Sequence, residues 1–178
     1  MMMIRAVGCC SAAWLALTSL TACSPALDWR EFVPEGGELS ITLPCRPDRH
    51  ARVVVISDAK VEMTMLVCSA GEATYAVSYF DVTDPARVSP ALVEWRAASV
   101  ANVKATLPVP TPLPLRGATP NDQAGRIVVE GHLPDGLAVQ EHAAFFVRGL
   151  RVYAATVIGE KPPPQVVEVF FAGLKFPG

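Results

Sequence analysis

The stretch that decides the fold runs from residue 125 to residue 159 and reads GRIVVEGHLPDGLAVQEHAAFFVRGLRVYAATVIG. Three segments in it, 125–133, 137–148 and 151–159, are rich in β-branched and aromatic residues, which favour strands. Pro134-Asp135-Gly136 separates the first two, and there proline fixes φ while glycine accepts a positive φ. Arg148-Gly149-Leu150 forms a second turn signal. The stretch therefore predicts three consecutive antiparallel strands.

Four more strand-like segments precede it, at 39–43, 51–57, 61–67 and 74–80. Met63, Met65 and Val67 alternate with Thr64 and Leu66, and the third and fourth segments are separated by the turn-like residues 70–72. Short turns between alternating segments are typical of antiparallel neighbours. We expect these strands to form a meander.

A helix is predicted over residues 90–104. Ser89 is a good N-cap, and Pro90 fits the first helical turn because its missing N–H has no partner there. Leu92, Trp95, Ser99 and Val103 follow helical spacing, whereas Glu94 and Arg96 fall outside that stripe. We expect Trp95 to lie against the sheet.

Prolines occupy every second position from Pro108 to Pro114. Proline donates no ladder hydrogen bond, so residues 107–120 cannot form a central strand. The segment is either a stiff connection back to the sheet, which we favour, or a ligand for the groove of a partner. Farther on, Val166, Phe170 and Leu174 favour a helix over 165–174, although the Val and Phe content leaves a strand open.

The element order indicates an α+β fold: a largely antiparallel sheet of six to seven strands, a mid-chain helix and a C-terminal helix. Two short segments, LSITLPC at 39–45 and FFAGLKF at 170–176, flank this pattern. With the helix and the meander they resemble small exported proteins of the PsbP-like α/β/α sandwich. Known members of that family are mostly accessory or assembly factors without catalytic activity, so the resemblance implies such a role.

The N-terminus reads MMMIRAVGCCSAAWLALTSLTAC and contains one charge, Arg5, before an apolar run of signal-peptide length. Its end, Leu20-Thr21-Ala22-Cys23, resembles the lipobox of bacterial lipoproteins. This resemblance implies a cellular location but no activity. The resemblance implies a signal peptide at 1–22, lipidation of Cys23, a tether at 23–37 and one globular domain at 38–178. The alternative is an ordinary secretory signal with a cysteine there by chance. Ser24 implies sorting to the outer membrane, facing the periplasm.

Cys45 and Cys68 are the cysteines left once the signal and the lipidated Cys23 are set aside. Exported proteins mature in an oxidising compartment, where two remaining thiols tend to pair. Each cysteine ends a strand-like segment, so we expect a disulfide between the ends of two neighbouring strands. Two buried free thiols are the alternative. A redox-active pair is disfavoured because the Cys-x-x-Cys spacing is missing.

Charge and motifs argue against several function classes. The 178 residues contain 15 Lys and Arg against 17 Asp and Glu, which disfavours nucleic-acid binding. The sequence contains no nucleophile elbow, phosphate loop, dinucleotide fingerprint or zinc-protease motif. Across the expected hairpin His132 and His142 lie ~13 Å apart, too far for one ion. We expect no metal and no cofactor.

Two further sets of residues allow more than one interpretation. Glu130 and Glu141 lie in the same hairpin and could pass for a catalytic carboxylate pair, but we favour two residues on an exposed sheet face, where such pairs are common. A set of aromatic residues either belongs to the core or lines a ligand pocket between sheet and helix: Tyr75, Tyr79, Trp95, Phe145, Phe146 and Tyr153.

The leading hypothesis is a non-enzymatic envelope lipoprotein, an accessory or binding domain that is anchored by acylated Cys23 and recognises another envelope protein. One rival hypothesis is a carrier of an apolar ligand, which a cavity beneath Trp95 would support. The other is an envelope hydrolase with an unrecognised site, which a cleft containing a carboxylate or histidine with a perturbed pKa would support.

Overall fold

The computed structural model describes residues 27–34 and 38–177. The predicted signal peptide 1–22, the lipid site Cys23 and parts of the tether 23–37 lie outside those residues. Within the described ranges, no helix has the length and apolar character needed to cross a membrane.

The main sheet has six strands, all antiparallel, in the order β3-β4-β5-β8-β7-β6. Two three-strand meanders meet at its centre, where β5 pairs with β8 and Tyr79 lies opposite Tyr153. The predicted α+β class is confirmed. The strands are β3 (Asp48–Ile56), β4 (Ala59–Ala70), β5 (Ala73–Asp81), β6 (Gly125–His132), β7 (Ala138–Arg148) and β8 (Arg151–Gly159).

A second, small sheet consists of β1 (Arg30–Phe32) and β2 (Ile41–Leu43). Its first strand was not predicted. Trp29 and Phe32 pack against the core. The prediction that 39–43 belongs to the meander is wrong. Leu39, Ile41 and Leu43 are buried against one face of the main sheet, so β2 forms part of a covering layer.

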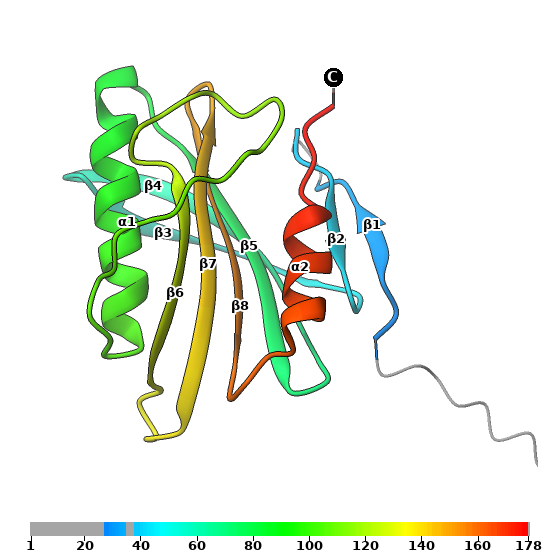
Figure 1. Ribbon diagram of the computed structural model, residues 1–178. Coiled ribbons are helices and arrows are strands. Elements are labelled where there is room, and N and C mark those ends of the chain that lie inside the picture. Colours follow the sequence, from blue (N-terminus) through cyan, green and yellow to red (C-terminus); the bar gives the residue numbers. More distant parts are fainter. Residues whose placement is uncertain (1–26, 35–37, 178) are drawn as a thin grey trace, which may run out of the picture.

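The molecule has three layers (Figure 1). Helix α1 (Val88–Asn102) covers one face of the main sheet, while helix α2 (Pro164–Ala172) and the small sheet cover the other. The helix favoured for 165–174 is thus confirmed, although it ends at Ala172. Because strand side chains alternate between faces, each face has its own core: Phe80, Leu92 and Phe145 on the α1 side, and Tyr75 and Phe170 on the α2 side.

The start of α1 differs from the prediction. Asp84, not Ser89, acts as the capping residue: its side chain accepts a hydrogen bond from Ala86 N at 2.9 Å and begins the 3₁₀ turn η1 (Pro85–Arg87), which continues into α1. Ser89 Oγ instead accepts a hydrogen bond from Asn121 Nδ2 at 3.0 Å. Asp84-Pro85 offers the same cap-and-proline signal as Ser89-Pro90, five residues earlier.

The buried face of α1 also differs. Arg96, predicted to lie outside the stripe, is only 6% exposed, and it continues a buried row with Val88, Leu92 and Val100. Its guanidinium donates to the carbonyl of Gln123 at 2.7 Å, so the connection after the proline segment supplies the partner that makes this burial possible. Burial lowers the pKa of Arg96.

The proline segment 107–120 connects α1 to β6, in agreement with the favoured interpretation. Thr111 bridges to Arg126 through a pair of backbone hydrogen bonds of 2.8 Å, so the connection covers the start of the outer edge of β6. Thr119 N donates to Val147 O, also at 2.8 Å. No part of the segment enters the sheet as a central strand.

Candidate functional site

Cys45 and Cys68 form a disulfide, with their Cα atoms 6.0 Å apart. The predicted pairing is confirmed, but the expectation that it joins the ends of neighbouring strands is wrong. Cys68 lies inside β4, and Cys45 follows β2 of the small sheet. The bridge therefore ties the covering layer to the main sheet.

The aromatic residues expected to line one pocket are divided by the sheet. Tyr75, Tyr79 and Tyr153 lie on the α2 side, whereas Phe145 and Trp95 lie on the α1 side. The prediction of a shared pocket for them is therefore wrong.

Both aromatic groups are closely packed. On the α2 side Phe146 stacks on Tyr153 with ring centroids 5.2 Å apart, and burial raises the pKa of Tyr153 to about 12. On the α1 side the Trp95 ring lies 4.9 Å from that of Phe80 and 6.3 Å from that of Phe145, so side chains fill the space beneath it.

The two glutamates of the β6–β7 hairpin do not form a carboxylate pair. Glu130 lies opposite Gln140, whereas Glu141 lies opposite Val129, so the carboxylates occupy opposite faces of the sheet. Glu141 is 3% exposed beneath α1, where its carboxylate accepts a hydrogen bond from Ser99 Oγ at 2.5 Å. Burial raises the pKa of Glu141.

The histidines are separated in the way the sequence predicted. His132 lies opposite Ala138, and His142 lies farther along the hairpin opposite Val128. His142 Nε2 bonds to Gln140 Oε1 at 2.8 Å, and burial lowers the pKa of His142. Among the described residues no three His, Cys, Asp or Glu side chains are grouped so that they could hold a metal ion.

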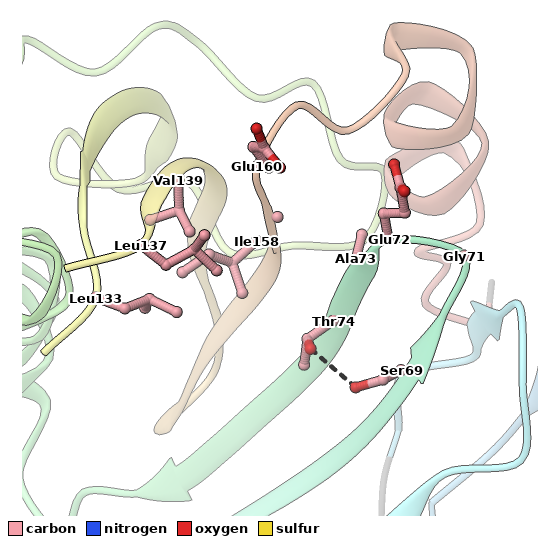
Figure 2. Close-up of a pocket in the computed structure, with 11 residues that line it drawn as sticks. Ser69, Gly71, Glu72, Ala73, Thr74, Leu133, Leu137, Val139, Ile158 and Glu160 are labelled. Carbon is pink, nitrogen blue, oxygen red and sulfur yellow. Dashed lines mark hydrogen bonds between the residues drawn. The ribbon is translucent and has the colours of Figure 1, made fainter. Parts of the chain in front are cut away.

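The candidate site is a hollow of about 410 Å³ at one end of the main sheet, which we call the end hollow (Figure 2). Three segments far apart in sequence form it: the β4–β5 turn, the β6–β7 hairpin and the end of β8. Its lining residues are Ser69, Gly71, Glu72, Ala73, Thr74, Leu133, Leu137, Val139, Ile158, Gly159 and Glu160.

The end hollow lies where α1 no longer covers the sheet. Along the α1 face of β4, Val61 and Met63 are buried, Met65 and Val67 are half-buried, and Ser69 is exposed. The hairpin turn Pro134-Asp135-Gly136 brings Leu133 and Leu137 to this uncovered area. Leu137 is 51% exposed, which is unusual for a leucine beside other apolar side chains.

The two walls of the end hollow differ in character (Figure 2). Leu133, Leu137, Val139 and Ile158 make an apolar wall. On the opposite wall the hydroxyls of Ser69 and Thr74 hydrogen-bond to each other at 2.8 Å. The hollow therefore offers apolar contact on one side and polar contact on the other.

Two carboxylates stand at the rim. The β5–β8 ladder ends with Ala73 opposite Gly159, so Glu72 and Glu160 occupy the next facing positions. The strands approach closely here: a Cβ on Gly159 would lie 2.5 Å from Glu72 O, so only glycine fits. Both glutamates are exposed, and neither forms a salt bridge within the part of the chain that the structure describes.

The chain enters the domain beside the end hollow. A Cβ on Gly71, in the β4–β5 turn, would lie 3.7 Å from Leu27 Cδ2, and the Trp29 ring meets Tyr75 edge-on with centroids 5.9 Å apart. Four residue steps separate Leu27 from Cys23, and such a segment spans at most ~14 Å. A lipid attached at position 23 would therefore be joined to Leu27 by no more than that length of chain.

Sequence reasoning did not find the end hollow. The one local signal for it is the pair of leucines that flank Pro134-Asp135-Gly136, since both lie next to a tight turn where polar residues are usual. The chain matches no protein-family model, and no curated protein is detectably similar to it in sequence.

Proposed function

We propose that the protein is a non-enzymatic lipoprotein of the bacterial envelope whose domain binds another envelope protein. In this proposal acylated Cys23 holds it at the periplasmic face of the outer membrane, and the end hollow is the binding surface. The observation that carries the proposal is the position of the Leu27 side chain beside Gly71 of the β4–β5 turn, because it would keep the hollow close to the anchored end. The Cys45–Cys68 disulfide supports export, since such bridges persist in oxidising compartments.

The layer arrangement supports a finer proposal, that the domain is a variant of the PsbP-like sandwich. The main sheet lies between α1 on one face and α2 with the small sheet on the other. A family whose members are mostly accessory factors favours a binding role for this chain, as the resemblance in 39–45 and 170–176 implied.

The chemistry of the end hollow supports binding rather than catalysis. A nucleophilic hydroxyl needs an adjacent base to activate it. Here the hydroxyls of Ser69 and Thr74 are bonded to each other, and the rim carboxylates Glu72 and Glu160 are exposed to water. The buried Glu141 contacts Ser99 under α1 and does not line the hollow. An open surface with apolar and polar walls suits recognition of another protein.

Replacing Cys23 with alanine in the full chain tests the anchor. We expect Cys23→Ala to abolish labelling with a radioactive fatty acid and to leave the protein uncleaved or soluble in membrane fractionation, because the thiol that takes the lipid is gone. Cys10→Ala, a cysteine inside the predicted signal, is the matched control and should be labelled and cleaved normally. Normal lipid labelling of Cys23→Ala would refute the proposal.

A further inference from the structure

We propose that the end hollow binds a peptide segment of the partner protein in which a lysine or arginine lies between apolar side chains. The inference rests on the proposed binding function and names the chemistry that the site recognises. Three features of the hollow lead to it: an apolar wall, a pair of facing carboxylates, and an open shape.

The apolar wall requires apolar side chains in the ligand. Leu133, Val139 and Ile158 line it together with Leu137, whose exposed half remains in contact with water in the free domain. Covering this surface removes apolar area from water, which favours association. The side chains come from β6–β7 and β8, two elements of the main sheet that are paired, so the wall is preformed.

The facing carboxylates favour a positive charge in the ligand. Like charges in directly opposed positions of an antiparallel pair repel each other and destabilise it. Glu72 and Glu160 occupy the first facing positions beyond the β5–β8 ladder, and both extend to the same side of the strand ends (Figure 2). No cationic side chain among the described residues forms a salt bridge with either of them. A cation from a partner that lies near both carboxylates would reduce this repulsion.

A basic residue flanked by apolar ones combines these requirements. Lysine and arginine lay their aliphatic stems along apolar surfaces and keep the charged head at a polar edge. A stem resting on Ile158 would direct its head to the rim, where Glu72 and Glu160 could accept charge-assisted hydrogen bonds. The flanking apolar side chains of the peptide would then cover Leu133 and Leu137.

The charge and shape of the hollow favour a peptide over a lipid headgroup. Anionic phospholipids carry a net negative charge that two neighbouring carboxylates repel, and a zwitterionic headgroup offers a cation without the flanking apolar side chains of a peptide. The hollow is also open and lies across the ends of two hairpins, so it can hold an extended chain that enters from one side and leaves at the other.

The test measures binding of acetyl-Leu-Lys-Leu-amide to the full chain by methyl NMR, in phosphatidylcholine nanodiscs if the chain is lipidated and in buffer if it is not. We expect shift changes concentrated at the methyls of Leu133, Leu137, Val139 and Ile158. The charge-reversed peptide acetyl-Leu-Glu-Leu-amide should bind about tenfold more weakly, because it meets two like charges.

Variants locate the charge recognition. Glu72→Gln and Glu160→Gln should each weaken binding of the lysine peptide about two- to fivefold, the range of a solvent-exposed ion pair. Glu62→Gln, which removes an exposed carboxylate of β4 outside the hollow, is the matched control and should change nothing.

Equal binding of the lysine and glutamate peptides, or shift changes concentrated outside the methyls of these four residues, would overturn the inference. So would a response of the same methyls to phosphatidylethanolamine nanodiscs without a response to the peptide, which would assign the hollow to a lipid amine. Because the measurement does not depend on the anchor, loss of lipidation at Cys23 leaves its result intact. A lipidated chain that fails to bind the peptide refutes the peptide assignment alone.

Discussion

Replacing both Cys45 and Cys68 with alanine should lower the free energy of unfolding by about 3 kcal/mol while leaving the folded structure unchanged. The bridge joins residues separated by 23 positions. In the chain-entropy model, closing a loop of that length removes enough disorder from the unfolded chain to stabilise the fold by about 3 kcal/mol at 25 °C. Cys68 is 7% exposed, so its truncation leaves a small void that adds up to ~1 kcal/mol.

The folded state should keep its structure because the small sheet does not depend on the bridge for its position. Leu39, Ile41 and Leu43 are at most 1% exposed and lie in the core on the α2 side. Ser40 and Lys175 exchange backbone hydrogen bonds of 2.8 and 2.9 Å, which hold β2 to the end of the chain. The bridge therefore acts mainly on the unfolded chain.

The assay is urea unfolding followed by circular dichroism, for the oxidised protein, the same protein with reductant, and the double alanine variant. With an m-value of about 2 kcal/mol/M, a loss of 3 kcal/mol lowers the midpoint by ~1.5 M. Reductant should lower the midpoint of the native protein and leave the variant unchanged. A loss below ~1 kcal/mol would refute the entropic reasoning, as would a native spectrum altered by the substitutions.

Two further predictions concern the interface between α1 and the sheet. Trp95→Ala should lower the free energy of unfolding by about 2 kcal/mol, less than for a fully buried tryptophan, because the ring is half-buried against Phe80. A decrease below ~0.5 kcal/mol in chemical denaturation would mean that the ring contributes little to stability. Because burial raises the pKa of Glu141, its ionisation costs stability as pH rises above the ordinary carboxyl value of 4.5, so Glu141→Gln should be more stable than the native protein at about pH 8 and similar to it at about pH 4. Glutamine can still accept the hydrogen bond from Ser99, and an unfolding difference that is the same at both pH values would contradict this reasoning.

Local signals in the sequence predicted much of the main sheet. Pro134-Asp135-Gly136 fixes a turn whose geometry is set by three residues, and the facing of His132 and Ala138 follows from it. The position of 39–43 could not be predicted in the same way. A strand with alternate buried side chains has the same sequence pattern whether it belongs to the main sheet or covers one of its faces. Only tertiary contacts distinguish the two arrangements.

The candidate site was less accessible from the sequence. The end hollow is lined by residues of three separate segments, such as Ser69, Leu133 and Ile158. No local sequence pattern indicates that these segments meet at one end of the sheet. Arg96 shows the same limit, because its burial depends on the Gln123 carbonyl, which a different segment provides. The Cys45–Cys68 disulfide was predicted because two remaining thiols in an oxidising compartment tend to pair with each other.

The pairing of β5 with β8 has a consequence for the order of folding. The first three strands of the main sheet can pair locally, but the inner edge of β5 acquires its partner only when residues 151–159 follow near the C-terminus. Contacts between such distant segments form slowly, because a long loop must close before they can form. Until residues 151–159 are made, β5 presents an open edge that could pair with another chain. A chain truncated before Arg151 should therefore remain unfolded or aggregate. If the protein is exported as proposed, its main sheet cannot close until residues 151–159 are available.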